Sequence, residues 1–488
     1  MFVDRKLNIR KFSQKRNFSN HKGFLYELLS NSWKLLLPIA TIVVLIISGI
    51  EGTYSVPIFF IFFLLLGLLI VCFLVCSEDK KVSIKLFISI FTYNTLIVVF
   101  FFFIFQIRYG NHYLSGGTDD MYYEYLGRYA ANSLKTQGEI VIPRVENTMG
   151  RSPYRYEKYR TFITIIAGVY FMSDVIADDM HTLNVRIMNS LAIGLISVFA
   201  FSLAIMCGLS KPFSFIGAFA AGIYTPQAFW GAVIIRDIWI VLLCIASVFF
   251  FKRLITSNKR SFWKYLLFFS LMTYSISLFR VQSAILIIAA FCLFVVFYTL
   301  KRKGIIIKTG FLILYLLLLI FLFSSTVEYI NNELTPIIIR HTNYRMNFAY
   351  GLSKFIFGLP LIPFGMVIRP LYALISPFPS FSLDVQPLFE NVSTIGVILM
   401  LPYVFIGFFR SISKKNLAIL GIAPLILLLG TSWTTSHFRH LLVYMPYIFL
   451  LMAYGWSTLK KPIRLLYISI FVNSFFFLIY ISLKTFGG

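Results

Sequence analysis

The sequence predicts an all-α polytopic membrane protein with about 13 transmembrane helices, in a range of about 11 to 14. Of the 488 residues, 59% are hydrophobic and only 13% are charged, whereas a soluble domain carries about 25% charged residues. Apolar stretches recur at close to the roughly 20 residues that a bilayer core requires. None of them alternates with a period of two, so helices are expected rather than the strands of an outer-membrane barrel.

The hydropathy pattern places these spans in order along the chain. The first follows a long basic arm and is followed at once by further apolar stretches, so we expect a membrane helix rather than a cleaved signal peptide. All five cysteines fall inside expected spans and predict no disulfide framework. The expected spans are 34–50, 56–76, 85–106, 187–208, 212–228, 237–252, 263–279, 281–299, 308–326, 386–408, 416–431, 440–457 and 465–482.

Charged residues divide unevenly between the alternating loops. One set of loops carries 27 of the 44 Lys and Arg residues and only 4 of the 19 Asp and Glu residues. Such an excess of basic residues marks the cytoplasmic side. We therefore expect a multi-pass protein of a bacterial inner membrane with a cytoplasmic N-terminus and no nucleic-acid partner. The basic set comprises 1–34, 77–85, 209–212, 252–264, 301–308, 410–415 and 460–464.

This topology divides the chain into six parts. Residues 161–176 and 355–380 fit poorly as spans and are expected to be interfacial or re-entrant, although each could instead be a true span. The parts are a basic cytoplasmic arm (1–33), three transmembrane helices (34–106), an extracytoplasmic loop with an acidic motif and interfacial helices (107–186), further transmembrane helices (187–326), a second extracytoplasmic or re-entrant region (327–385) and the C-terminal transmembrane helices (386–488).

The acidic motif of the first long loop is the most informative stretch. Gly116 and Gly117 precede Asp119, Asp120 and Glu124. One interpretation is a pair of carboxylates displayed at the bilayer surface, one of them a general base. The other is ordinary helix-start chemistry, since acids are favoured in a first helical turn. Asp120 is slightly favoured as the base because Asp119 is better placed as the cap. No cofactor is expected with certainty, and a divalent cation at Asp119 and Asp120 stays open.

Arginine usage points to an anion site. The expected outer side holds 13 Arg and 4 Lys, whereas the cytoplasmic side holds 8 Arg and 19 Lys. A guanidinium binds phosphate through two parallel hydrogen bonds, which a solvated loop does not need. For each arginine singly, snorkelling or a local pair such as Arg236 with Asp237 is the alternative. Candidate substrate-binding residues are Glu124, Arg128, Tyr122, Tyr123, Arg236, Arg280, Arg345, Arg369, Arg439 and His440.

Aromatic residues and familiar motifs narrow the chemistry further. Tyr122 and Tyr123 belong to a tyrosine-rich segment that suits either an interfacial belt or stacking on sugar faces. No HExxH, P-loop, GxSxG or zinc spacing occurs in the sequence. Neither ATP hydrolysis nor serine-hydrolase chemistry is therefore expected.

The order of these motifs resembles the GT-C superfamily of membrane glycosyltransferases over roughly residues 107–255. The acidic motif is followed by the apolar segment YRTFITIIAGVYFM, by Arg186–Asn189 at the start of a span, and by Pro226 leading into Arg236. The resemblance implies an extracytoplasmic active site in which an acidic residue acts as base on the acceptor or binds a metal, and in which positive residues hold a lipid-linked phosphate. By the resemblance, Asp119 and Asp120 match the acidic motif, with Glu124 a weaker candidate.

The composition is also similar to that of O-antigen and capsule repeat-unit polymerases, which are Phe- and Ile-rich and carry essential arginines in outer loops. Either resemblance implies transfer of a sugar or oligosaccharide from a polyprenyl (pyro)phosphate donor to a glycan or lipid acceptor, in cell-surface polysaccharide assembly. The non-enzymatic alternative is a flippase or transporter for a lipid-linked glycan. Transporters carry charged residues near the membrane midplane and often consist of two similar halves. Here the charged residues lie at span ends and the two halves of the sequence do not correspond, which favours an enzyme.

Overall fold

The fold is that of an all-α membrane protein. A computed structural model describes residues 20–74, 79–114, 119–143, 159–300, 351–359, 364–375, 385–434 and 438–486, together with Gly310 and Asn343. Every element in these ranges is a helix. Nine helices there are long and apolar enough to cross a membrane: Leu25–Glu51, Ser55–Leu74, Lys80–Tyr109, Arg160–Ala177, Thr182–Cys207, Asp237–Thr256, Lys259–Phe279, Gln386–Ser413 and Arg439–Thr458.

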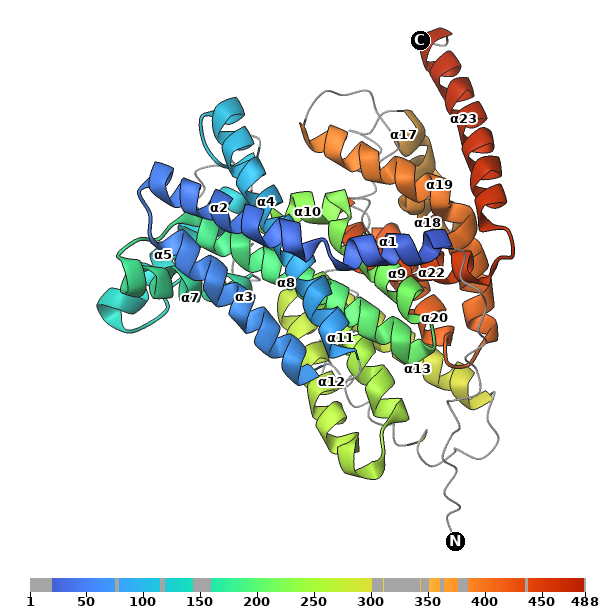
Figure 1. The fold of residues 1–488 in the computed structure, drawn as a ribbon, viewed down its shortest axis with the longest axis horizontal. Coiled ribbons are helices and arrows are strands. Elements are labelled where there is room, and N and C mark those ends of the chain that lie inside the picture. Colours follow the sequence, from blue (N-terminus) through green and yellow to red (C-terminus); the bar gives the residue numbers. More distant parts are fainter. Residues whose placement is uncertain are drawn as a thin grey trace.

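Most of the N-terminal half, apart from its first helix, lies at the left and centre of Figure 1, around a central helix. That helix, α8 (Thr182–Cys207), is buried along almost its whole length. It contacts α3 (Ser55–Leu74), α4 (Lys80–Tyr109), α9 (Lys211–Ile223) and α11 (Asp237–Thr256). Before this group, α1 (Asn20–Ser30) leads into α2 (Trp33–Glu51), and after it α12 (Lys259–Phe279) leads into α13 (Val281–Leu300).

The C-terminal helices form the right side of Figure 1. They are α17 (Gly351–Gly358), α18 (Met366–Ile375), α19 (Val385–Ser413), α20 (Ala418–Thr434), α21 (Phe438–Leu441), the 3₁₀ turn η5 (Leu442–Tyr444), α22 (Met445–Thr458) and α23 (Pro462–Phe486). α22 packs against both α19 and α9, which joins the two halves.

Large apolar side chains cover the outside of the bundle. Leu35, Phe73, Trp263 and Phe471 are each more than half exposed. A folded protein in water does not leave an apolar surface of this extent uncovered. These side chains are in their preferred solvent when the helices stand in a bilayer.

Contacts between connections define two ends of the bundle. At one end, Lys211 Nζ lies 2.9 Å from an oxygen of Asp79. Lys252 Nζ donates to the Asn416 carbonyl at 3.1 Å, and Arg410 Nη1 donates to the Thr458 carbonyl at 2.7 Å. These contacts lie in or beside the loops whose basic residues predict the cytoplasmic side. The opposite end carries the acids and arginines described below.

One expected span is divided in two in the structure. The stretch expected as one span over 212–228 is two helices, α9 and the seven-residue α10 (Thr225–Gly231), which has a proline in its first turn. Because proline lacks an amide hydrogen and restricts the residue before it, Pro226 favours a break at this point. The expected span 308–326 lies outside the described residues, so a count of 13 stays a prediction.

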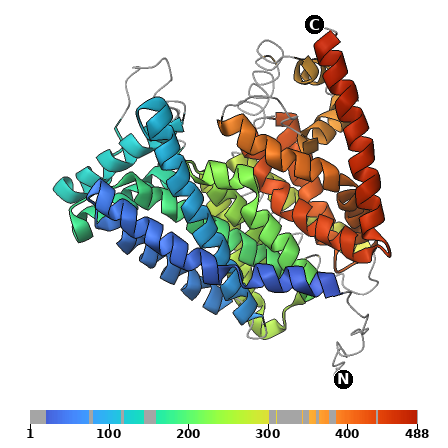
Figure 2. The same ribbon diagram turned by 45° about the horizontal axis from the view of Figure 1, so that its top comes forward.

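The two segments that fit poorly as spans are also helical. α7 (Arg160–Ala177) is long enough to cross a membrane, but it packs along α5 (Asp119–Gln137), whose many polar and charged side chains make it unsuited to a span. Figure 2 shows both helices at the end of the bundle where α2 ends. This arrangement favours the interfacial interpretation of 161–176. Residues 355–380 contribute the short helices α17 and α18, and the rest of that segment is outside the described ranges.

Candidate functional site

A buried carboxylate organises one end of the bundle. Asp237 is the first residue of α11, and its side chain is only 6% exposed. Arg280, between α12 and α13, donates to Asp237 Oδ1 at 2.6 Å. His440 of α21 places Nδ1 3.1 Å from the same oxygen. A buried ion requires close partners because it has lost its hydration, so Asp237 fixes both of these side chains.

This contact corrects the expected local pair of Arg236 with Asp237. Arg236 instead donates through Nη1 to the carbonyl of Phe279, and its guanidinium lies 3.9 Å from the ring centre of Tyr159. The carbonyl and the ring together fix the orientation of the Arg236 guanidinium. Arg236 thus contacts the end of α12, directly before Arg280.

A third arginine reaches the same region from the other half of the chain. Arg439 donates through Nη1 and Nη2 to Asp119 Oδ2, both at 3.1 Å. These two residues are 320 positions apart, and their side chains are 20% and 21% exposed. Arg439 also lies 5.9 Å from the ring centre of Trp230, and its Nε is buried with no hydrogen-bond partner. We call Arg236, Arg280, Arg439, Asp119, Asp237 and His440 the arginine cluster.

Tyr123 lies within reach of this cluster. Its side chain is almost fully buried, and it contacts the rings of Tyr159 and Phe162 at 5.8 and 5.2 Å between centroids. Burial raises the pKa of Tyr123, which Arg236 opposes and Tyr159, Asp119 and Asp237 reinforce. The Tyr123 hydroxyl is therefore protonated and uncharged. Its neighbour Tyr122 is also buried in α5.

The two aspartates of the acidic motif have different surroundings. Asp120 is buried, and its carboxylate accepts the backbone N–H groups of Leu114 at 2.9 Å and Met121 at 3.0 Å. Asp119 is the more exposed of the two and faces Arg439. Asp120 therefore bonds the backbone amides around the start of α5, the role expected of Asp119, and Asp119 is the more accessible carboxylate. The sequence leaves this register open by one residue.

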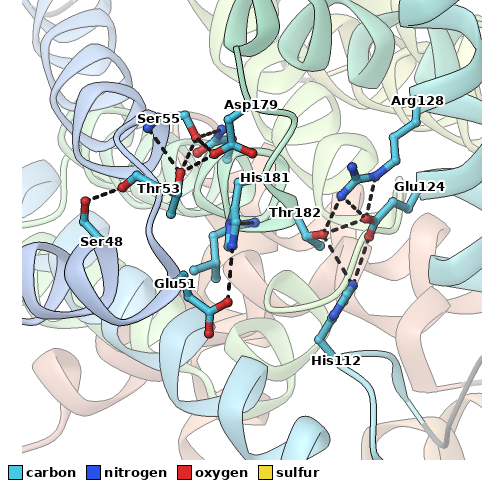
Figure 3. Close-up of polar contacts among 12 residues, drawn as sticks. Ser48, Glu51, Thr53, Ser55, His112, Glu124, Arg128, Asp179, His181 and Thr182 are labelled. Carbon is cyan, nitrogen blue, oxygen red and sulfur yellow. Dashed lines mark hydrogen bonds and ion pairs between the residues drawn. The ribbon is translucent and has the colours of Figure 1, made fainter. Parts of the chain in front are cut away.

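Glu124 anchors α5 to α8 (Figure 3). Its Oε1 accepts from Arg128 at 2.7 and 2.8 Å and from the Thr182 hydroxyl at 2.6 Å. His112 Nε2 lies 3.5 Å from Oε2. Burial acts to raise the pKa of Glu124, but the nearby His112, the charge of Arg128 and the hydrogen bond from Thr182 outweigh it and lower this pKa to about 2. Glu124 and Arg128 thus pair with each other rather than with a residue of the arginine cluster.

A second polar network lies beside Glu124 in Figure 3. Asp179 accepts hydrogen bonds from the hydroxyls of Thr53 and of Ser55, the latter at 2.9 Å. Asn184 donates to Ser55 at 2.8 Å and to Ser173 at 2.7 Å. These contacts join the turn between α2 and α3 to the turn between α7 and α8. The network therefore holds α7 on the bundle, and α5 packs along α7. We call these two helices together the platform.

Buried polar residues at the start of α8 bond the backbone of segments that neighbour the site. Arg186 is fully buried and donates through Nη2 to the His112 carbonyl at 2.6 Å. Asn189 donates to the carbonyls of Gly231 and Val233 at 3.1 and 2.9 Å, and accepts from Trp239 at 3.0 Å. Asn189 fixes the segment that leads into Arg236, a role that the sequence did not predict. An asparagine in an apolar span was the available signal, because such residues need partners in lipid.

Two candidate arginines are not placed in the cluster. Arg369 is buried and donates to the carbonyls of Phe357 and Leu359 at 3.1 and 3.2 Å, so it connects α17 to α18. Arg345 lies outside the described residues. In the described part of the chain, no group of three or more His, Cys, Asp or Glu side chains is arranged to hold a metal ion.

Comparisons of the chain with protein-family models, with curated proteins and with solved structures find no match. The class that the fold and site define is an all-α membrane protein with a cluster of arginines and acids at one end of its bundle. Its function is inferred below from that chemistry alone.

Proposed function

We propose that this protein is a membrane glycosyltransferase that moves a sugar or oligosaccharide from a polyprenyl (pyro)phosphate to an acceptor hydroxyl. The observation that carries the proposal is the ion pair of Asp119 with Arg439 beside two further arginines. A carboxylate and several guanidinium groups together suit a reaction that needs a base and releases a phosphate.

The chemistry follows from these two kinds of group. The acceptor oxygen attacks the anomeric carbon of the donor sugar, and its proton passes to the Asp119 carboxylate. The bond between that carbon and the phosphate oxygen breaks, and the phosphate leaves with the electron pair. Guanidinium groups stabilise the added negative charge because their positions are already fixed before the reaction.

The position of the site agrees with a lipid donor. The cluster lies at the ends of α11 and α12, where a phosphate at the membrane surface can reach it while its polyprenyl chain stays in the bilayer. The excess of basic residues on the opposite loops supports an extracytoplasmic location for this end. Cell-surface polysaccharide assembly is the process that uses such donors on that side.

A reconstituted assay tests the proposal. The purified chain in lipid nanodiscs is incubated with radiolabelled glycans on polyprenyl phosphate or polyprenyl pyrophosphate and with glycan or lipid acceptors. We expect transfer of label to an acceptor, and the length of the product distinguishes a single transfer from repeat-unit polymerisation. Movement of the donor across the membrane without any transfer, measured in vesicles, would identify a flippase and contradict the proposal.

A further inference from the structure

The arginine cluster contains one fixed ion pair and one that is able to exchange. Asp237 holds Arg280 at 2.6 Å, and their side chains are only 6% and 10% exposed. Separating that pair would leave a buried charge without a partner, which is strongly unfavourable. Asp119 and Arg439 are at the longer distance of 3.1 Å and about one fifth exposed. A pair of this kind contributes little to stability, so a competing anion can separate it.

The geometry of Arg439 is also suited to an anion that presents a separate oxygen to each of its N–H groups. Both of its terminal nitrogens donate to the same oxygen, Asp119 Oδ2. Its Nε is buried and has no hydrogen-bond partner. A guanidinium binds best when its parallel N–H groups meet two different oxygens. A phosphate group would provide them, while Asp119 leaves part of this donor capacity unused.

We infer that Asp119 and the phosphate of the donor compete for Arg439, so that donor binding releases the Asp119 carboxylate to act as the base. This inference rests on the proposed function. A carboxylate paired with a guanidinium is a weaker base than one that has lost its partner. The base therefore becomes effective only when a phosphate has taken its place. Arg280 stays in position throughout, because Asp237 holds it from the buried side.

The competition predicts opposite effects of one substitution on binding and on turnover. Removing the negative charge in Asp119→Asn should tighten phosphate binding roughly 1.4-fold to fivefold, the range that one partly exposed ion pair covers. The same substitution should abolish glycan transfer. A carboxylate that only positions the acceptor, or that binds the phosphate through a cation, predicts unchanged or weaker binding instead.

The experiment measures dissociation constants of the full-length protein in nanodiscs for polyprenyl phosphate and, separately, for inorganic phosphate. Tightening for both probes shows competition for the phosphate group itself, and tightening for the lipid alone shows that the chain is also required. Asp119→Ser is a second variant that also removes the negative charge if Asp119→Asn is unstable. Glu51→Gln is the matched control, since Glu51 is 24% exposed and pairs with His181.

A double-substitution cycle makes the result specific to Arg439. In an Arg439→Gln background, which removes the positive charge, the gain in affinity from Asp119→Asn should largely disappear because the two groups no longer form an ion pair. An equal gain in that background, an equal gain from Glu51→Gln, or no gain in either Asp119 variant would overturn the inference.

The outcome is separable from that of the proposed function. Loss of transfer in Asp119→Asn without tighter phosphate binding would leave the glycosyltransferase in place and remove the competition. The opposite result is also informative. If Asp119→Asn binds phosphate more tightly in a way that depends on Arg439, but the wild-type protein transfers no glycan, the competition for phosphate stands and the release of a base is overturned.

Discussion

At the scale of single residues, the three arginines of the cluster are held by three different kinds of partner. Arg280 has a buried carboxylate, Arg236 has a carbonyl and an aromatic ring, and Arg439 has a partly exposed carboxylate. Each arrangement uses the flat shape of the guanidinium as well as its charge. Substitutions that keep the charge and change the shape therefore report on function.

Arg439→Lys should lower glycan transfer by about tenfold or more while the protein stays folded, because an ammonium group cannot donate two parallel hydrogen bonds to a phosphate. Initial rates of transfer, normalised to the monodisperse fraction, measure the effect. Arg108→Lys is the control, since Arg108 is exposed at the end of α4. Equal rates in both variants would make Arg439 an interfacial anchor only.

Asp119→Asn and Asp120→Asn should have different effects. Loss of a general base lowers the rate by about 10²–10⁴-fold with folding intact, which we expect of Asp119→Asn. Asp120→Asn should lower the free energy of unfolding by about 1–3 kcal/mol, because a buried carboxylate loses its charge-assisted bonds to backbone N–H groups. Transfer rates and thermal unfolding midpoints separate the two. Near-normal turnover in Asp119→Asn would remove the catalytic assignment.

Glu124 predicts a loss of stability in acid. Its pKa in the folded protein is about 2, below the ordinary value of 4.5, so the unfolded chain takes up the proton more readily. The stabilisation is complete above about pH 4.5 and is lost as the pH falls toward 2, by an amount on the order of a few kcal/mol. The unfolding midpoint should therefore fall less with acid in Glu124→Gln than in the wild type.

The exposed Glu139→Gln provides the comparison for that measurement, because Glu139 lies beyond the end of the same helix. A wild-type protein and a Glu124→Gln variant with the same dependence on pH would show that the hydrogen bonds to Glu124 contribute no net stability.

At the scale of elements, glycines decide how closely the helices approach. α19 and α22 cross where a Cβ on Gly407 would lie 2.0 Å from the Leu451 carbonyl oxygen, and a Cβ on Gly455 would lie 2.0 Å from that of Tyr403. Small residues at a helix crossing let the backbones meet, which is a main source of stability between helices in lipid. This crossing helps to position α21, and therefore Arg439 and His440, against the N-terminal half.

Gly407→Ala should destabilise the protein, because the obstacle is backbone and cannot rotate away. Alanine elsewhere in a helix is usually favourable over glycine by up to about 1 kcal/mol. Gly396→Ala is the matched control, since Gly396 is in the same helix and a Cβ there meets nothing within 4 Å. Yield after size-exclusion chromatography and thermal midpoint are the measurements. Equal behaviour of both variants would mean that α19 and α22 do not meet this closely.

At the scale of the whole molecule, the bundle has two chemically different ends. Lysines dominate the connections at one end, as in the contacts of Lys211 and Lys252. Arginines and acids dominate the other, where α5 and α7 form a platform (Figure 1). Such an asymmetry orients a protein in its membrane. The proposed function requires the arginine end to face away from the cytoplasm.

Cysteine labelling tests this orientation. A cysteine at the exposed Gln137, at the end of α5, should react with an impermeant thiol reagent added to intact spheroplasts. A cysteine at Asn258, in the turn before α12, should react only after the membrane is opened. Labelling of the protein without an added cysteine measures the reaction of the native cysteines. The reverse pattern would invert the topology and contradict an extracytoplasmic site.

The helices themselves follow largely from the sequence. The expected spans 34–50, 56–76, 237–252 and 263–279 agree to within a few residues with α2, α3, α11 and α12. Hydropathy determines them because a helix in lipid satisfies its own backbone hydrogen bonds and needs no distant partner. The break at Thr225 is less predictable, since proline favours but does not require it.

The partners of the candidate site residues were decided by tertiary structure. The sequence identified Asp119, Arg236, Arg280, Arg439 and His440 as candidates from their residue types and their positions at span ends. It could not pair Asp119 with Arg439 across 320 positions or show that Asp120, rather than Asp119, bonds a backbone amide beside the start of α5. A local pattern determines which face of a helix is apolar, whereas the meeting of two side chains depends on how every intervening helix packs.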